Sequence, residues 1–151
     1  MLVEKIEMNV NDIEEAELAK LHKEKVYLES ADLLKRILRV KTDHGKDIGI
    51  SLKERQALTK GDVLYKDASN IIFIDVYQDD VIVIHPKDIH EMGVIAHQLG
   101  NRHLPAQFEV DNMIVQYDYL VEELLKQLDI SYQREERKLK EAFKHIGHSH
   151  D

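Results

Sequence analysis

The sequence contains no cysteine among its 151 residues. This absence excludes a disulfide framework, a metal site built from thiolates and a cysteine nucleophile. Any metal that the chain binds must therefore be held by nitrogen or oxygen ligands. No apolar run approaches the roughly 18 residues of a membrane span, and the N-terminal residues lack both a basic region and a long apolar stretch. We therefore expect a cytoplasmic protein without a membrane partner.

Sequence motifs of common enzyme classes are missing as well. The chain has no His-Glu-x-x-His pair, no Gly-rich phosphate loop and no Gly-x-Ser-x-Gly elbow. Acidic residues outnumber basic ones, which gives a formal net charge of -8. Nucleic-acid phosphates would be repelled over most of such a surface. The composition thus argues against nucleic acid and favours a cationic ligand.

The first half of the chain is typical of short strands joined by polar turns. The strands are predicted from apolar and β-branched runs at 26–28, 36–41, 48–52, 63–65 and 71–76. Turn residues at 43–46 join the second and third runs as a hairpin. Residues 11–24 are charged and interrupted, and they fit either a short helix or a loop. We expect an all-β N-terminal domain over residues 1–77.

After about Tyr77 the pattern changes to strands that alternate with longer helices. The predicted order is strand 81–84, helix 88–99, strands 107–109 and 113–116, helix 118–128 and strand 130–134. Asp88 is the expected cap of the first helix, and Gly100 is its expected end because glycine tolerates positive φ. The predicted buried faces of the two helices are Ile89, Met92, Ile95, Ala96 and Leu99, then Leu120, Val121, Leu124, Leu125 and Leu128.

This order of elements matches a ferredoxin-like βαββαβ unit. The predicted fold class is therefore α+β, in three parts. An all-β N-terminal domain is followed by a ferredoxin-like domain over residues 78–143 and by a disordered, histidine-containing tail over residues 144–151.

Three of the nine histidines, His145, His148 and His150, lie in the last eight residues. Neutral imidazole is the commonest protein ligand for borderline divalent metals, and a short His-rich tract is typical of metal binding. In an extended segment, His148 and His150 present both rings on one side because they are two residues apart. A solvated tail without a function explains this composition equally well at this point.

Another histidine, His103, directly follows the first predicted helix of the second domain. Histidine at such a position is often structural, since it can donate to the terminal carbonyls or be stabilised by the helix dipole. The polar neighbours Asn101 and Arg102 can instead hold the imidazole in a defined direction. On the same helix, His90 and His97 are ~10.5 Å apart, which makes a direct clamp on one ion improbable. A solvated face explains them better, and an auxiliary role for His97 stays open.

Segments spread along the whole chain support a more specific hypothesis. The segments are Lys35–Arg39, Gly61–Tyr65, Glu91–Gly93, Gly100–His103, Tyr132–Arg137 and Gly147–His150. Together they resemble the urease accessory protein E family, whose members are cytoplasmic metallochaperones that bring nickel to urease. The resemblance implies a non-enzymatic Ni²⁺ carrier that delivers its ion to the urease apoprotein and its accessory GTPase complex.

The resemblance also implies a structure for the metal site. Family members have a peptide-binding-like N-terminal domain and form a homodimer through the ferredoxin-like domain. The histidine that matches His103 lies at the two-fold axis, so that two copies share one ion. The tail histidines that match His148 and His150 complete a nitrogen-rich site for Ni²⁺, with His145 as a further candidate and Zn²⁺ and Cu²⁺ as competitors.

The chain departs from part of the family before its second helix. Some members carry a His-x-His pair there, where this chain has Tyr117-Asp118-Tyr119. Asp118 is either a weak oxygen ligand or simply the cap of the helix. Two alternative functions also remain: a metal-dependent hydrolase around His103, and a metal-independent interaction module centred on the N-terminal domain. A catalytic metal needs rigid ligands, which histidines on a terminal tail do not provide.

Overall fold

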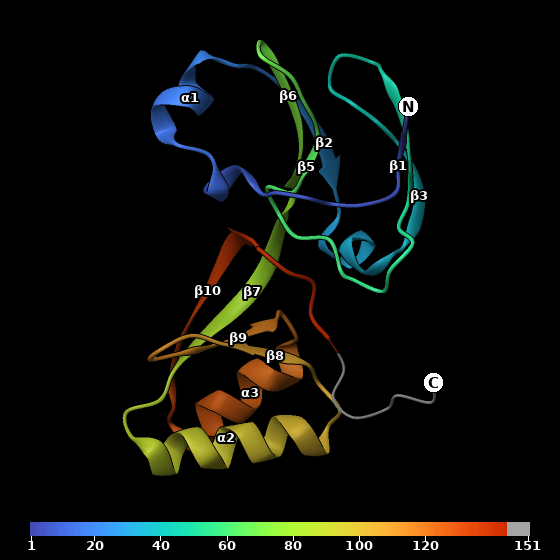
Figure 1. Ribbon diagram of the computed structural model, residues 1–151. Helices are drawn as coiled ribbons and strands as arrows, with labels where there is room; N and C mark the ends of the chain where they lie inside the picture. The colour runs from blue at the N-terminus through green and yellow to red at the C-terminus, as the bar shows by residue number, and fades with distance from the viewer. Residues whose placement is uncertain (145–151) are drawn as a thin grey trace. The chain divides into compact units, whose positions relative to one another are not determined.

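The computed structural model describes residues 1–144, which fold into two compact units. Of the described residues, unit 1 contains Met1–Tyr77 and Lys138–Ala142, and unit 2 contains Gln78–Arg137 together with Phe143 and Lys144. Figure 1 labels most of their helices and strands. The predicted disordered tail, apart from Lys144, lies outside the described residues. Within residues 1–144, no helix combines the length and the apolar character needed to cross a membrane.

Unit 1 is built mainly from two small sheets. Its elements are β1 (Leu2–Val3), η1 (Val10–Asp12), α1 (Glu15–Lys20), β2 (His22–Leu28), η2 (Ser30–Leu34), β3 (Ile37–Lys41), β4 (Asp47–Ser51), β5 (Val63–Lys66) and β6 (Asn70–Val76). The strand orders are β1-β4-β3 and β2-β6-β5. The predicted hairpin is confirmed as the antiparallel pair β3–β4, whose turn contains Gly45 at φ 82. The description all-β was too narrow, because part of the undecided stretch 11–24 forms α1.

The core of unit 1 follows from the alternation of side chains on its strands. In β2, Val26 and Leu28 are buried, whereas Tyr27 between them is 39% exposed. The neighbouring β6 runs parallel to β2, lies at the centre of its sheet and buries apolar residues on both faces. Residues Lys138–Ala142 join this unit, since the Lys60 amide donates to the Lys140 carbonyl at 2.9 Å and Ala142 packs in the core.

Unit 2 has the predicted order of strand, helix, strand, strand, helix and strand. Its elements are β7 (Gln78–His85), α2 (Ile89–Asn101), β8 (Ala106–Phe108), β9 (Met113–Gln116), α3 (Tyr119–Leu128) and β10 (Ser131–Lys138). The strand order in its sheet is β10-β7-β9-β8, and β9 is antiparallel to both β7 and β8. The helices α2 and α3 lie on the same side of this sheet (Figure 1). Their buried residues pack with those of the sheet in one apolar cluster.

The predicted buried faces of the two helices need correction at their edges. Ile89 is 90% exposed and Leu120 is 58% exposed, whereas Ile95 and Val121 are at most 1% exposed. An α-helix turns by about 100° per residue, so Ile89 and Leu120 lie roughly a quarter turn or more from the centre of the buried face. Leu128, the last residue of α3, is 39% exposed. The sheet therefore covers a narrower stripe than the apolar pattern predicts.

Candidate metal centre

The end of α2 gives His103 an uncommon backbone conformation. Arg102 is the C-cap, and His103 after it has φ 57, in the left-handed region. The His103 amide donates to the Gly100 carbonyl at 3.0 Å, and the Leu104 amide donates to the Leu99 carbonyl at 3.1 Å. These two bonds form a Schellman motif, whose left-handed residue is usually glycine. The prediction that Gly100 ends the helix was wrong, because α2 continues past it to the cap.

The other long helix of unit 2 ends in the same way, at Asp129. This residue has φ 55, and the Ile130 amide donates to the Leu125 carbonyl at 3.0 Å. Histidine and aspartate are among the residues that adopt the left-handed conformation more often than most. Glycine would still adopt the left-handed conformation at lower cost, because it has no Cβ to crowd the backbone. The backbone alone therefore does not account for a histidine at position 103.

The backbone around His103 is well anchored, although His103 itself is exposed. Leu99 is only 2% exposed, and Leu104 packs against the apolar cluster of unit 2. The polar neighbours bond back to the helix: Arg102 Nη1 donates to Gln98 Oε1 at 3.1 Å, and Asn101 Nδ2 lies 3.3 Å from His97 Nε2. The loop thus presents His103 from a fixed position at the end of α2.

Asp118 lies near this loop but has a structural role of its own. Leu104, Pro105, Tyr117 and Asp118 are among the residues that line a small cavity of about 90 Å³. The Leu120 amide donates to Asp118 Oδ1 at 2.8 Å. Asp118 therefore caps α3, which agrees with the capping role that was one of the two hypotheses for this residue.

The remaining predicted ligands, His145, His148 and His150, lie outside the described residues. Among residues 1–144, no three side chains of the metal-binding types are grouped so that they could hold an ion. The described part of one protomer therefore offers His103 as a single candidate ligand and not a complete site.

Comparisons with known proteins bear directly on this candidate. The family profile "UreE urease accessory protein, N-terminal domain" matches residues 3–76, and "UreE urease accessory protein, C-terminal domain" matches residues 79–151. The chain is 59% identical to urease accessory protein UreE of Staphylococcus aureus (strain Newman) over 151 residues, which is all of both chains. The chain belongs to the UreE urease accessory protein family. The UreE protein of Staphylococcus epidermidis (strain ATCC 12228 / FDA PCI 1200) is 58% identical, again over the full length of both.

Membership of the UreE family confirms the family prediction and its functional class. These proteins are non-enzymatic nickel chaperones for urease maturation. The hydrolase alternative and the metal-independent module are therefore wrong for this chain.

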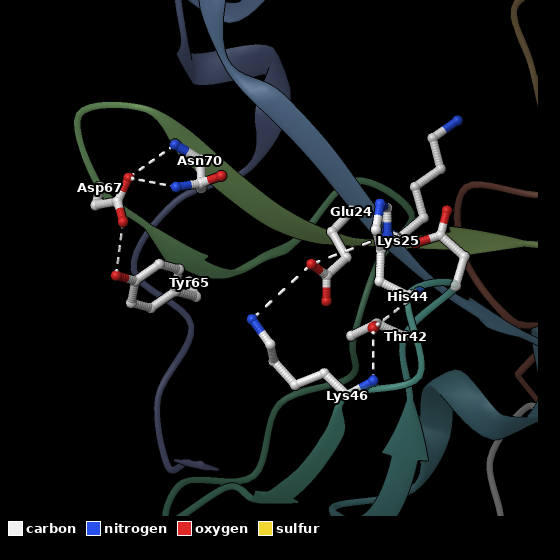
Figure 2. A network of polar contacts seen from close by, with 9 residues as sticks. Glu24, Lys25, Thr42, His44, Lys46, Tyr65, Asp67 and Asn70 are labelled. Carbon is white, nitrogen blue, oxygen red and sulfur yellow. Dashed lines mark hydrogen bonds and ion pairs between the residues drawn. The ribbon is translucent and has the colours of Figure 1, made fainter.

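In this UreE family member, the structure also brings together two histidines to which the sequence assigned no role. The rings of His22 and His44 have centroids 5.0 Å apart. His44 Nδ1 lies 2.8 Å from Asp43 Oδ1 and 3.9 Å from Glu24 Oε1, and Figure 2 shows His44 beside Glu24. The Lys25 amide, helped by His44, holds the pKa of Asp43 below its usual value. Alternation along β2 puts His22 and Glu24 on one face, but the sequence could not indicate that the 43–46 turn packs beside them.

Proposed function

We propose that this chain carries Ni²⁺ as cargo at the two-fold axis of a homodimer, with His103 of each protomer as the shared ligand. The backbone conformation of His103 is the observation that carries this proposal. Glycine would adopt the left-handed conformation at lower cost, so side-chain chemistry explains a histidine at this position better than the backbone does. One exposed imidazole binds a metal weakly, and two-fold symmetry doubles the number of nitrogen ligands.

The tail histidines His145, His148 and His150 supply the further ligands in this proposal. Ligands on a terminal segment can leave one at a time, which keeps the cargo exchangeable. Imidazole nitrogen suits Ni²⁺, and Zn²⁺ or Cu²⁺ compete for the same ligands because they prefer similar donors. Asp118 is left out of the proposed site, because its Oδ1 already accepts the hydrogen bond that caps α3.

The domain organisation in this proposal has three parts. Residues 1–77 form a peptide-binding-like domain, residues 78–143 form a ferredoxin-like domain that carries the dimer contact, and residues 144–151 form the histidine tail. The order of helices and strands in unit 2 supports the ferredoxin-like assignment. In the cytoplasm, the dimer would deliver Ni²⁺ to the urease apoprotein and its accessory GTPase complex, in keeping with the name of its relatives.

Calorimetric titration with Ni²⁺ and native mass spectrometry of the dimer test this function. The wild type should hold about one ion tightly per dimer, because the axis contributes one pair of His103 ligands. His103→Ala should lose this tight site. His90→Ala is the matched control, because His90 is an exposed histidine of the same unit that lies within α2 and is not part of the proposed site. Undiminished tight binding by His103→Ala would show that His103 is not the shared ligand. A monomer with a complete tight site would show that the axial arrangement is wrong.

A further inference from the structure

Unit 1 contains a cavity of about 230 Å³ that plays no part in the proposed nickel site. It lies beside β2 and β6, and Lys25 and Asp75 of these strands take part in its lining. Lys25 pairs with Phe73 in the parallel register of the two strands, and Phe73 also lines the cavity. All of the residues that line it belong to unit 1.

Two lysines converge on a buried carboxylate in this cavity. Asp75 is 5% exposed. Its carboxylate accepts two hydrogen bonds from Lys138 Nζ, at 3.1 and 3.2 Å, and lies 3.5 Å from Lys25 Nζ. Burial by itself would raise the pKa of Asp75, but the Val76 amide, Lys138 and Lys25 outweigh burial and lower it. Asp75 is therefore ionised at neutral pH and holds both ammonium groups at the cavity.

A third lysine, Lys60, gives the cavity an excess of positive charge. Lys60 is exposed, and within residues 1–144 its ammonium has no ion pair. The chain is fixed on either side of it: the Lys60 amide donates to the Lys140 carbonyl at 2.9 Å, and Gly61 has φ 92. A Cβ at Gly61 would lie only 2.8 Å from Asn9 Oδ1, so the close approach requires glycine. The lining of the cavity thus contains three lysines and one aspartate, in a chain whose net charge is -8.

We propose that this cavity binds a side-chain carboxylate from an acidic segment of a partner protein. A carboxylate entering beside Lys60 can share Lys25 and Lys138 with Asp75, because an ammonium group has three donors. A phosphate dianion fits less well, since its extra charge would be repelled by Asp75 and the cavity offers no arginine for bidentate binding.

Exposed aromatic side chains near the cavity can contact the residues that flank such a carboxylate in the partner segment. Tyr27 and Tyr77 are 39% and 51% exposed, and their ring centroids are 5.7 Å apart. Lys138 Nζ lies 5.9 Å from the centre of the Tyr27 ring, so this aromatic surface adjoins the charged one. Exposed tyrosines with lysines beside them offer apolar contact and hydrogen bonds to a polypeptide.

The proposal is tested by NMR titration of the full-length, ¹⁵N-labelled protein with three probes. The probes are the capped peptide acetyl-Gly-Glu-Glu-Gly-amide, its glutamine counterpart and inorganic phosphate. The glutamate peptide should give saturable shifts of the Gly61 and Asn11 amides, which lie at the cavity. Lys60→Gln should weaken this binding about two- to five-fold, the loss expected for one exposed ion pair, and added salt should weaken it further.

Lys53→Gln is the matched control. Lys53 is also an exposed lysine of unit 1, but it pairs with Glu4 at 3.3 Å and does not line the cavity. This variant should bind the glutamate peptide as the wild type does. The proposal is overturned if the glutamate peptide gives no saturable shift, if the glutamine peptide binds equally well, or if phosphate binds more tightly than the glutamate peptide. Equal effects of Lys60→Gln and Lys53→Gln would likewise overturn it.

Discussion

Replacing His103 with glycine separates the backbone role of this residue from its side-chain role. The bonds that close α2 are backbone bonds, from the His103 amide to the Gly100 carbonyl and from the Leu104 amide to the Leu99 carbonyl. Glycine preserves them and removes the imidazole together with the Cβ. His103→Ala removes the imidazole as well, but it keeps a Cβ in the left-handed conformation at φ 57. Both variants thus lack the imidazole, and they differ in the conformational free energy of the backbone at position 103.

The size of this difference follows from the conformation. The left-handed conformation destabilises the folded state by roughly 1–2 kcal/mol for a residue with a Cβ. Glycine avoids this cost. Its greater conformational freedom in the unfolded chain, however, lowers the free energy of unfolding by about 0.5–1 kcal/mol relative to alanine. We therefore expect the free energy of unfolding to be about 0.5–1 kcal/mol higher for His103→Gly than for His103→Ala. In a protein of this size, that corresponds to about 1–4 °C in Tm.

Thermal unfolding of the metal-free variants measures this difference, and Ni²⁺ titration of the same samples measures the loss of the tight site. The protomer concentration must be equal in all samples, because the stability of a dimer depends on concentration. We expect both variants to lose tight Ni²⁺ binding, and His103→Gly to unfold at the higher temperature of the two.

Either of two results would refute this reasoning. If His103→Gly were less stable than His103→Ala, the left-handed conformation would not be the dominant cost at this position. If His103→Gly kept the tight site, the imidazole would serve the helix end and the nickel ligands would lie elsewhere.

Three further predictions concern the tail, the cap of α3 and the buried carboxylate of unit 1. Deleting residues 144–151 should lower the Ni²⁺ affinity and the number of protons taken up when an ion is released, since fewer imidazoles bind protons between about pH 7.5 and 6. If calorimetry finds the same affinity and the same pH dependence without the tail, its histidines are not ligands. Asp118→Ala should lower the free energy of unfolding by about 0.5–2 kcal/mol through loss of the α3 cap and leave Ni²⁺ affinity unchanged, and a weaker nickel site would instead indicate a ligand. Asp75→Asn should destabilise unit 1 by about 1–3 kcal/mol in urea unfolding, because it leaves Lys25 and Lys138 without their carboxylate. Since the pKa of Asp75 is lowered in the folded state, its contribution is present above the usual carboxyl pKa and lost as pH falls below about 4, so the difference between wild type and Asp75→Asn should shrink there.

The elements of unit 2 were predictable because their sequence patterns are local. A continuous apolar run at 81–84 becomes the buried part of β7, and Asp88 caps α2 by accepting from the Glu91 amide at 2.8 Å. Asp118 caps α3 in the same way. Such signals depend on residues within one or two helical turns, so they can be read without knowledge of the fold.

The errors arose where a long-range contact decides between local options. Gly100 was a reasonable helix end by composition, but packing of Leu104 against the unit 2 cluster draws the chain into a Schellman motif three residues later. The exposure of Ile89 and Leu120 depends on how much of each helix the sheet covers. Neither outcome follows from the apolar periodicity of the helix alone.

By itself, the sequence determined the type and order of the elements of unit 2, the family and the histidines available as ligands. These properties depend on residue chemistry and on short-range spacing. The tertiary structure alone decided that His103 occupies a left-handed position, that Lys25 and Lys138 contact Asp75, and that Lys60 lines the same cavity. Lys138 is 63 residues from Asp75 along the chain, and only folding brings their charges within 3.2 Å.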